Sequence, residues 1–221
     1  TLIIKELRIT EKGASFKLKQ GETELFKTAS FFNDYNIENL AAAFALAHFF
    51  LPKSFLQKLD WQKLTPVPGR MQPASPSLPL TLIDFAHTPD GLLKALVSLR
   101  PICQGKLWVI FGCGGDRDAQ KRALMGEVAE QHADKVVITS DNPRSEDPRK
   151  IIEQIIKPLS KPFFQFIDRK EAIEYAITHA DKKDILLIAG KGHEEYQIIG
   201  DKKFAFSDFE HARLALARRK K

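Results

Sequence analysis

The segment "TSDNPRSEDP", residues 139–148, combines residue types that can bind a charged small molecule. Arg144 has a planar guanidinium, which suits a carboxylate or a phosphate through two parallel hydrogen bonds. An acid, Asp141, and an amide, Asn142, lie on the same short loop. Pro143 pushes the residue before it toward an extended backbone. The segment could therefore present a fixed arginine to an anionic ligand.

The same segment also has a purely structural interpretation. Asp147 and Pro148 suit the N-cap and the first position of a following helix. The loop would then be a capping turn, and Arg144 would be solvated. Taken alone, the segment favours this simpler interpretation.

Residues 112–118, "GCGGDRD", resemble a dinucleotide-binding loop but lack its third glycine, because Arg117 stands at that position. The glycines still allow the backbone to approach a ligand closely. Arg117 would then point from the loop toward the start of a helix. A glycine turn with a surface arginine explains this segment equally well.

Residues 189–195, "AGKGHEE", form a third segment of this kind. Gly190 frees the backbone so that its carbonyl can face a ligand, and Glu194 offers a carboxylate. The pattern G-x-x-x-x-G-K-[ST] does not occur in the sequence, so no phosphate-binding P-loop is predicted. His193 has no second histidine at helical spacing, which argues against zinc. We therefore predict no metal site in this chain.

Three further residues could contact a nucleotide. Asp84 and His87 follow the apolar run "LTLI", where they suit ribose hydroxyls and phosphate, or a helix-capping turn. Arg70, in "PGRMQ", lies in a proline-rich connector. It could reach a γ-phosphate, or it could be a solvated linker residue.

The elements that must position these residues alternate between strands and helices. After residue 79, the short apolar runs "LTLIDFAH", "KLWVIFG", "KVVITS", "FFQFID" and "DILLIAG" are each followed by a helical segment. This alternation predicts βαβ units and a mostly parallel sheet in a Rossmann-like, three-layer α/β domain. Loops that follow the strands gather along one edge of such a sheet, where ligands bind. Most of the residues singled out above fall in those loops.

The first part of the chain has a different pattern. Residues 1–28 alternate in polarity, and Gly13 and Gly21 suit the turns of β-hairpins. Asn36 or Asn39 could cap a helix through the alanine-rich stretch that follows.

A short helix is expected at residues 53–60, before a connector at residues 64–79 that is rich in proline. We place a domain boundary in this connector. It gives an incomplete first domain at residues 1–66, with hairpins and helices, and an α/β domain at residues 67–221.

The composition is that of a globular protein, with 221 residues of which 43% are hydrophobic and 28% charged. A net charge of +6 could suggest nucleic acid binding, but the terminal "RRKK" supplies four positive charges. We predict no membrane span and no signal peptide. Two cysteines indicate a reduced, cytoplasmic setting. The chain opens with a strand-like segment and no methionine, so we expect it to be part of a longer protein.

Taken together, the motifs resemble those of the Mur ligases. "FNDYNIENLAAA", "PVPGRMQ", "DFAHTPDGL", "FGCGGDRDAQKR", "TSDNPRSEDP" and "IAGKGHEEY" follow one another in the order of that family. The resemblance covers nearly the whole chain. It implies the end of the central ATPase domain followed by the C-terminal domain, and it is strongest to members that add meso-diaminopimelate.

The resemblance also implies an activity. Family members use ATP and Mg²⁺ to phosphorylate a carboxylate of a UDP-MurNAc-dipeptide, and the incoming amine attacks the acyl phosphate. The residues implied to contact ATP are Asn36, Asn39, Arg70, Asp84 and His87. Those implied to bind meso-diaminopimelate are Arg117, Asp141, Asn142, Pro143, Arg144, Gly190 and Glu194. Without a P-loop, we expect the chain alone to lack ligase activity.

Two positions depart from the family pattern, and three alternatives stay open. Phe85 stands where relatives often have tyrosine, and Gln72 where glutamate is common. The chain could belong to another Mur ligase or to a folylpolyglutamate synthetase, although the "DNPR" segment argues against both. It could also be a binding module without catalysis, or a basic nucleic-acid-binding domain.

Overall fold

The computed structural model describes residues 2–20, 23–52 and 58–219. The chain divides into two compact units, Thr1–Val67 and Pro68–Lys221. No helix within the described residues is long and apolar enough to cross a membrane.

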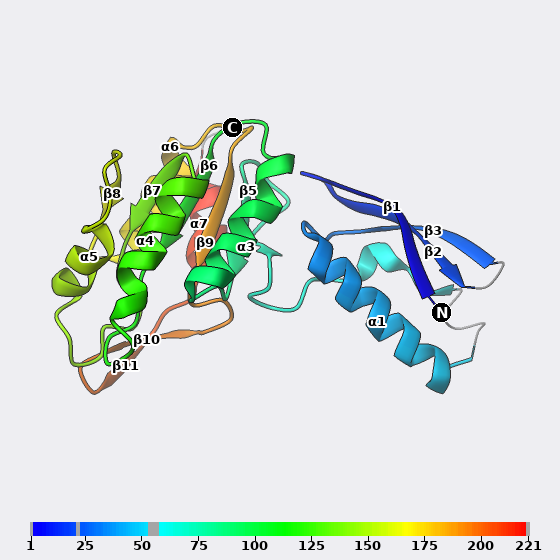
Figure 1. The fold of residues 1–221 in the computed structure, drawn as a ribbon, viewed down its shortest axis with the longest axis horizontal. Helices are drawn as coiled ribbons and strands as arrows, with labels where there is room; N and C mark the ends of the chain where they lie inside the picture. Colours follow the sequence, from blue (N-terminus) through cyan, green and yellow to red (C-terminus); the bar gives the residue numbers. More distant parts are fainter. Residues whose placement is uncertain (1, 21–22, 53–57, 220–221) are drawn as a thin grey trace. The chain divides into compact units, whose positions relative to one another are not determined.

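The first unit is a small antiparallel sheet with one long helix (Figure 1). Its strands β1 (Leu2–Thr10), β2 (Gly13–Gln20) and β3 (Thr23–Ala29) pair in sequence order as two hairpins. Helix α1 (Asp34–Phe50) and the 3₁₀ turn η1 (Trp61–Lys63) follow. Phe16, Phe44 and Trp61 are buried together in the core of this unit, with their rings in contact.

One expectation for this unit is wrong, and another falls on residues that the structure does not describe. The predicted caps of α1 were wrong, because the cap is Asn33, whose side chain accepts the N–H of Asn36 at 3.0 Å. Asn33 has the extended backbone that a cap needs, whereas Asn36 already lies inside the helix. Gly21 and most of the helix expected at residues 53–60 lie outside the described residues.

The second unit has a six-stranded sheet in the order β4-β5-β9-β6-β7-β8. All its strand pairs are parallel except β4 with β5. The strands are β4 (Gln72–Pro73), β5 (Leu80–Asp84), β6 (Leu107–Phe111), β7 (Lys135–Ile138), β8 (Phe164–Gln165) and β9 (Ile185–Ala189). Every residue of β5, β6 and β9 is buried, as a parallel sheet covered on both faces requires.

Helices cover both faces of this sheet (Figure 1). One face carries α3 (Pro89–Leu99), α4 (Gln120–His132) and α5 (Pro148–Ile156), which pack in sequence order. The other carries α6 (Arg169–His179) and α7 (Asp208–Arg218), packed on each other. The turn η2 (Arg100–Ile102) ends α3. The predicted three-layer α/β domain with a mostly parallel sheet is thus confirmed.

Local details of the second unit differ from expectation in two places. The proline-rich connector contains β4, a short antiparallel edge strand. A hairpin of β10 (Tyr196–Ile199) and β11 (Lys202–Ala205) lies between "GKGHEE" and α7, and it was not predicted from the sequence. Gly200, with a φ of 58°, supplies the left-handed turn between its strands.

Candidate functional site

A pocket of about 330 Å³ lies at the carboxyl ends of the parallel strands. The loops after β5, β6, β7 and β9 line it. The predicted binding residues among its lining are His87, Arg117, Asp141, Asn142, Arg144, Gly190 and Glu194. Pro143 belongs to the same loop but lines a separate hollow of about 360 Å³ with Gln197 and Ile199. The structure therefore brings together six of the seven residues proposed for the amino acid.

Arg144 is held in an unusual backbone conformation, with a φ of 53°. Such an angle is uncommon for a residue with a side chain and needs support from its surroundings. The Arg144 N–H donates to the carbonyl of Ile198 at 3.1 Å, and its carbonyl accepts from Gly200 at 2.7 Å. The hairpin β10–β11 thus holds the backbone of Arg144 from one side.

The side chain of Arg144 is held from the other side. Its Nη1 donates to the carbonyl of Gly115 at 2.8 Å. A side chain at Gly115 would collide with the carbonyl of Pro143, 1.9 Å from an added Cβ, so this close approach requires glycine. The guanidinium nitrogens Nε and Nη2 of Arg144 donate no hydrogen bond within the described part of the chain. They remain available to a ligand.

An ion pair joins α4 to residues 139–148, and its two members also bind residues 112–118, where Arg122 Nη2 donates to the carbonyl of Gly114 at 3.1 Å. Arg122 is almost fully buried, and its Nη1 and Nη2 each lie 2.8 Å from an oxygen of Glu146. The Asp116 N–H donates to the same carboxylate at 2.6 Å. These contacts hold the pKa of Glu146 near 2, with the Arg122 hydrogen bond as the main cause.

This depressed pKa predicts how stability depends on pH. The folded pKa is near 2 and the ordinary value is 4.5, so the stabilisation is complete above pH 4.5 and is lost as the pH falls toward 2. Glu146→Gln should lower the free energy of unfolding by about 1 kcal/mol at pH 7, since the carboxylate is about one-third exposed.

Thermal unfolding from pH 7 to pH 3 measures this effect. The difference between wild type and Glu146→Gln should shrink below pH 4.5. Glu127→Gln, an exposed glutamate of α4, is the control and should track the wild type. A Glu146→Gln deficit that stays constant down to pH 3 would contradict the assignment.

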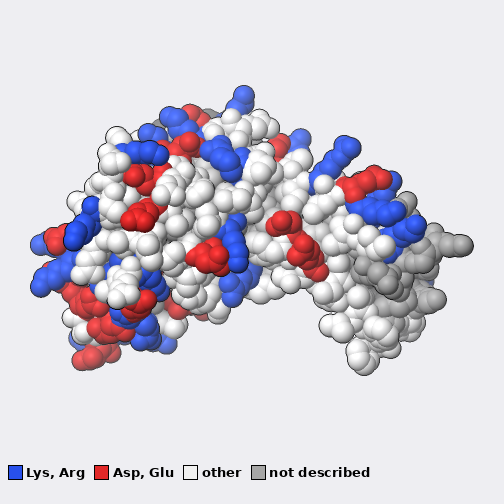
Figure 2. Space-filling model, in the orientation of Figure 1, with Lys and Arg blue, Asp and Glu red and all other residues white. Residues whose placement is uncertain are grey.

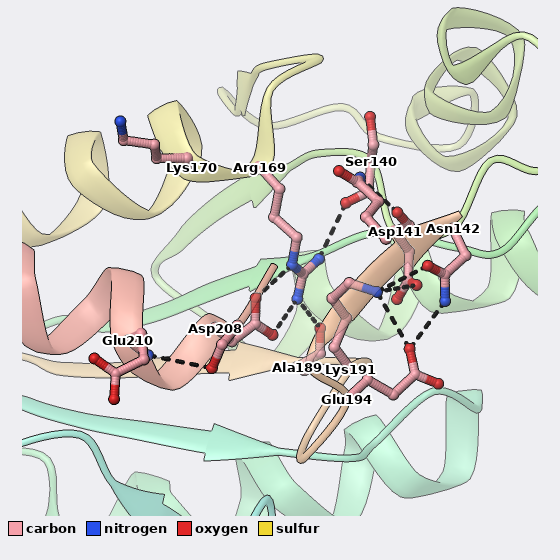
Figure 3. A network of polar contacts seen from close by, with 12 residues as sticks. Ser140, Asp141, Asn142, Arg169, Lys170, Ala189, Lys191, Glu194, Asp208 and Glu210 are labelled. Carbon is pink, nitrogen blue, oxygen red and sulfur yellow. Dashed lines mark hydrogen bonds and ion pairs between the residues drawn. The ribbon is translucent and has the colours of Figure 1, made fainter. Parts of the chain in front are cut away.

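A buried lysine contacts three residues of the pocket lining (Figure 3). Lys191 is fully buried, and its Nζ lies 2.9 Å from Asn142 Oδ1, 3.2 Å from Glu194 Oε2 and 3.5 Å from Asp141 Oδ1. Asn142 Nδ2 donates to Glu194 Oε2 at 2.9 Å. Three of the predicted substrate residues therefore meet at one ammonium group.

A second buried cation ties together the ends of two strands (Figure 3). Arg169 pairs with Asp208 through two contacts of 2.7 and 2.8 Å, and both side chains are fully buried. The same guanidinium donates to the carbonyls of Ser140, at 3.2 Å, and Ala189, at 2.9 Å. These two residues directly precede Asp141 and Gly190, so the ion pair supports the floor of the pocket.

The residues of this unit that are expected to contact a nucleotide are Arg70, Asp84 and His87, of which His87 also lines the pocket. Both carboxylate oxygens of Asp84 accept backbone N–H groups, from Met71 and Ala86, each at 2.9 Å. A ribose would have to share those oxygens. The guanidinium of Arg70 lies 5.0 Å from the ring centre of Phe85, and His87 contacts the same ring edge-on. Phe85 thus links Arg70 to His87.

The remaining two predicted residues lie in the first unit. Asn36 is buried in the first turn of α1, and Asn39 is exposed one turn later. Both positions stay predictions as nucleotide contacts.

Sequence reasoning missed the buried partners of the site. Lys191 stands inside the segment "AGKGHEE", but its neighbours in the sequence do not indicate that it is buried. Neither Arg122 nor Arg169 carried a signal, because each meets its acid only after folding. Within the described residues, no group of three or more His, Cys, Asp or Glu side chains could hold a metal ion.

Basic and acidic side chains are interspersed over the second unit on the face drawn in Figure 2. The positive net charge is therefore not gathered into one stripe on that face.

Residues 69–192 match the family model described as Mur ligase, glutamate ligase domain. A UDP-N-acetylmuramoyl-L-alanyl-D-glutamate--2,6-diaminopimelate ligase of Acidovorax sp. (strain JS42) is 45% identical, over 96% of this chain and 44% of the relative. The protein of that name from Coxiella burnetii (strain RSA 493 / Nine Mile phase I) is 46% identical, over 86% of this chain and 39% of the relative.

Solved structures agree with these relatives. A structure of a UDP-N-acetylmuramoyl-L-alanyl-D-glutamate--2,6-diaminopimelate ligase superposes with a TM-score of 0.75 at 36% identity, covering 98% of this chain and 45% of that one. A UDP-N-acetylmuramate-alanine ligase from Thermotoga maritima has a TM-score of 0.64 at 17% identity, which shows the shared fold alone.

The sheet and its helices define a three-layer α/β domain with a polar pocket at the carboxyl ends of its parallel strands. With the family match over more than half of its length, the chain belongs to the Mur ligase family. It spans less than half the length of the relatives compared here.

Proposed function

We propose that this chain is the C-terminal part of an ATP-dependent ligase that adds meso-diaminopimelate to UDP-N-acetylmuramoyl-L-alanyl-D-glutamate in peptidoglycan precursor synthesis. The observation that carries the proposal is the pocket in which the arginine of "DNPR" lies close to acidic side chains. ATP would phosphorylate the glutamate carboxylate. The amine of diaminopimelate would then attack the acyl phosphate and form the amide as phosphate leaves.

The pocket offers complementary groups to the distal end of diaminopimelate, which carries one carboxylate and one ammonium. Arg117 and Arg144 supply donors for the carboxylate. Asp141, Glu194 and the Gly190 carbonyl supply acceptors for the ammonium. Lysine lacks the distal carboxylate, so its binding would leave a desolvated guanidinium without a partner, which disfavours it.

The nucleotide-contacting roles of Asn36, Asn39, Arg70, Asp84 and His87 belong to the same proposal. The unit Thr1–Val67 would be the end of the central ATPase domain, and Pro68–Lys221 the amino-acid-binding domain. Mg²⁺ would accompany ATP, and within the described residues no group of three or more His, Cys, Asp or Glu side chains could hold it. We place the reaction in the cytoplasm, because it consumes ATP and both cysteines are free thiols.

The test is amino-acid-dependent ADP release by the full-length protein, with UDP-N-acetylmuramoyl-L-alanyl-D-glutamate as acceptor. The kcat/KM for meso-diaminopimelate should exceed that for lysine by about 100-fold or more. The 221-residue chain alone is the negative control. Equal use of lysine would overturn the substrate assignment. Absence of ADP release with every amino acid tested would favour a binding module without catalysis.

A further inference from the structure

Lys191 is the only charged side chain that contacts all three of Asp141, Asn142 and Glu194 among the residues that the structure describes. An ammonium has three N–H donors, and three oxygens of these residues lie within 3.5 Å of it. Burying a lysine away from water is costly unless the charge is paired and hydrogen-bonded. The site therefore keeps a buried cation directly behind the residues that face the ligand.

The lysine fixes the orientation of the Asn142 amide. Asn142 Oδ1 accepts from both Lys191 Nζ and the N–H of Ile198, each at 2.9 Å. Its Nδ2 must then point the other way, and it donates to Glu194 Oε2. Because Oε2 also accepts from Lys191, the Glu194 carboxylate is fixed by two donors on one oxygen. Its Oε1 makes no hydrogen bond within the described part of the chain.

The charges at this point do not cancel. Asp141 and Glu194 are two carboxylates that share the single positive charge of Lys191. The neighbouring buried cation, Arg169, is already paired with Asp208. Among these four side chains one negative charge is left over, and the ammonium of a bound ligand would balance it. Arg117 and Arg144 of the same pocket would face the carboxylate of that ligand. Without Lys191 the two carboxylates would repel each other.

We propose that Lys191 is a positioning residue for the ammonium end of the amino acid. It holds the Asp141 and Glu194 carboxylates together and turns the free oxygen of Glu194 toward the ligand. This inference rests on the proposed function, in which meso-diaminopimelate places its distal ammonium against those acids.

The test compares two amino acids in the full-length protein with Lys191→Met. Meso-diaminopimelate carries the distal ammonium, whereas 2-aminopimelate keeps the distal carboxylate and lacks that ammonium. The kcat/KM for meso-diaminopimelate should fall roughly 10- to 100-fold, mainly through KM. The kcat/KM for 2-aminopimelate should change less than about threefold, since it makes no use of the acids. The KM for ATP should stay the same.

Lys203→Met is the matched control. Both ammonium groups lie over the ring of Tyr196. Nζ of Lys203 is 3.6 Å from the ring centre, and Nζ of Lys191 is 5.9 Å from it. Lys203 is exposed on β11 and pairs with neither acid in the described residues. Lys203→Met should keep the wild-type ratio of kcat/KM for meso-diaminopimelate to that for 2-aminopimelate. Thermal unfolding of each variant shows whether it is folded, and Lys191→Gln replaces Lys191→Met if the latter is not.

A parallel loss with both amino acids, in a folded variant, would overturn the inference and leave the proposed function intact. Failure of both Lys191 variants to fold would also overturn it, because the lysine would then be structural. A wild-type protein that does not prefer meso-diaminopimelate over 2-aminopimelate would overturn both the inference and the function on which it rests.

Discussion

Arg144→Ala in the full-length protein is expected to raise the KM for meso-diaminopimelate strongly while leaving the KM for ATP nearly unchanged. Losing a charge-assisted, two-pronged contact in a desolvated pocket costs about 2–5 kcal/mol, or roughly 30-fold to several thousand-fold in kcat/KM. Arg144→Lys should recover only part of the loss, because a single ammonium cannot reproduce the fork of the guanidinium.

The same variant should lose selectivity. In one distal stereoisomer the carboxylate meets arginine and the ammonium meets acid, whereas the mirror arrangement brings like charges together. The measurement is kcat/KM for meso-diaminopimelate, L,L-diaminopimelate and lysine in wild type and Arg144→Ala, and the three values should converge in the variant. Arg149→Ala, an exposed arginine of α5, is the control. If the ratios of kcat/KM among the three amino acids stayed unchanged while ATP binding weakened, Arg144 would be assigned to the nucleotide site instead.

Arg169→Met is expected to destabilise the second unit by about 3–5 kcal/mol, because it leaves the fully buried carboxylate of Asp208 without a partner. It also removes the donors to Ser140 and Ala189. Replacing both members, as Arg169→Met with Asp208→Leu, should cost less than the single change. Denaturation followed by Trp108 fluorescence, in a Trp61→Phe background, reports on this unit alone.

The matched control is a pair with similar geometry on the surface. Arg213 and Glu210 lie 2.7 Å apart, but each side chain is about half exposed. Arg213→Met should change the free energy of unfolding by less than about 1 kcal/mol. If the two arginine substitutions were equally costly, burial would not be the cause of the Arg169 effect.

The sequence was informative wherever a local pattern decides the structure. Strands β6 and β9 are continuous apolar runs, and β5 is apolar except for Thr81 and Asp84, because both faces of the sheet are covered. The helices between the strands follow from their periodicity. The cap at Asp147 with Pro148 behind it was predicted from local chemistry alone and is present. Loops at the carboxyl ends of parallel strands must converge, so the grouping of the pocket residues was also predictable.

Local sequence patterns do not predict contacts between residues that are far apart in the chain. Lys191 meets Asp141 across the sheet edge, and Arg169 meets Asp208 between two helices. Nothing in the neighbouring residues distinguishes these buried cations from solvated ones. The prediction of the N-cap of α1 was wrong for a different reason. Asn33 and Asn36 have the same side chain, and only the backbone geometry determines which of them caps the helix.

The strand order has a consequence for the growing chain on the ribosome. Strand β9 is made after β5, β6, β7 and β8, yet it lies between β5 and β6. Until Ala189 has been synthesised, the facing edges of β5 and β6 have no partner, and such edges invite pairing with other chains. The middle of the sheet is thus completed late in translation. A nascent chain that stops short of β9 has residues 139–148 and their contacts with Gly115 and Arg122, but it lacks Lys191, Glu194 and the β10–β11 hairpin that holds the backbone of Arg144.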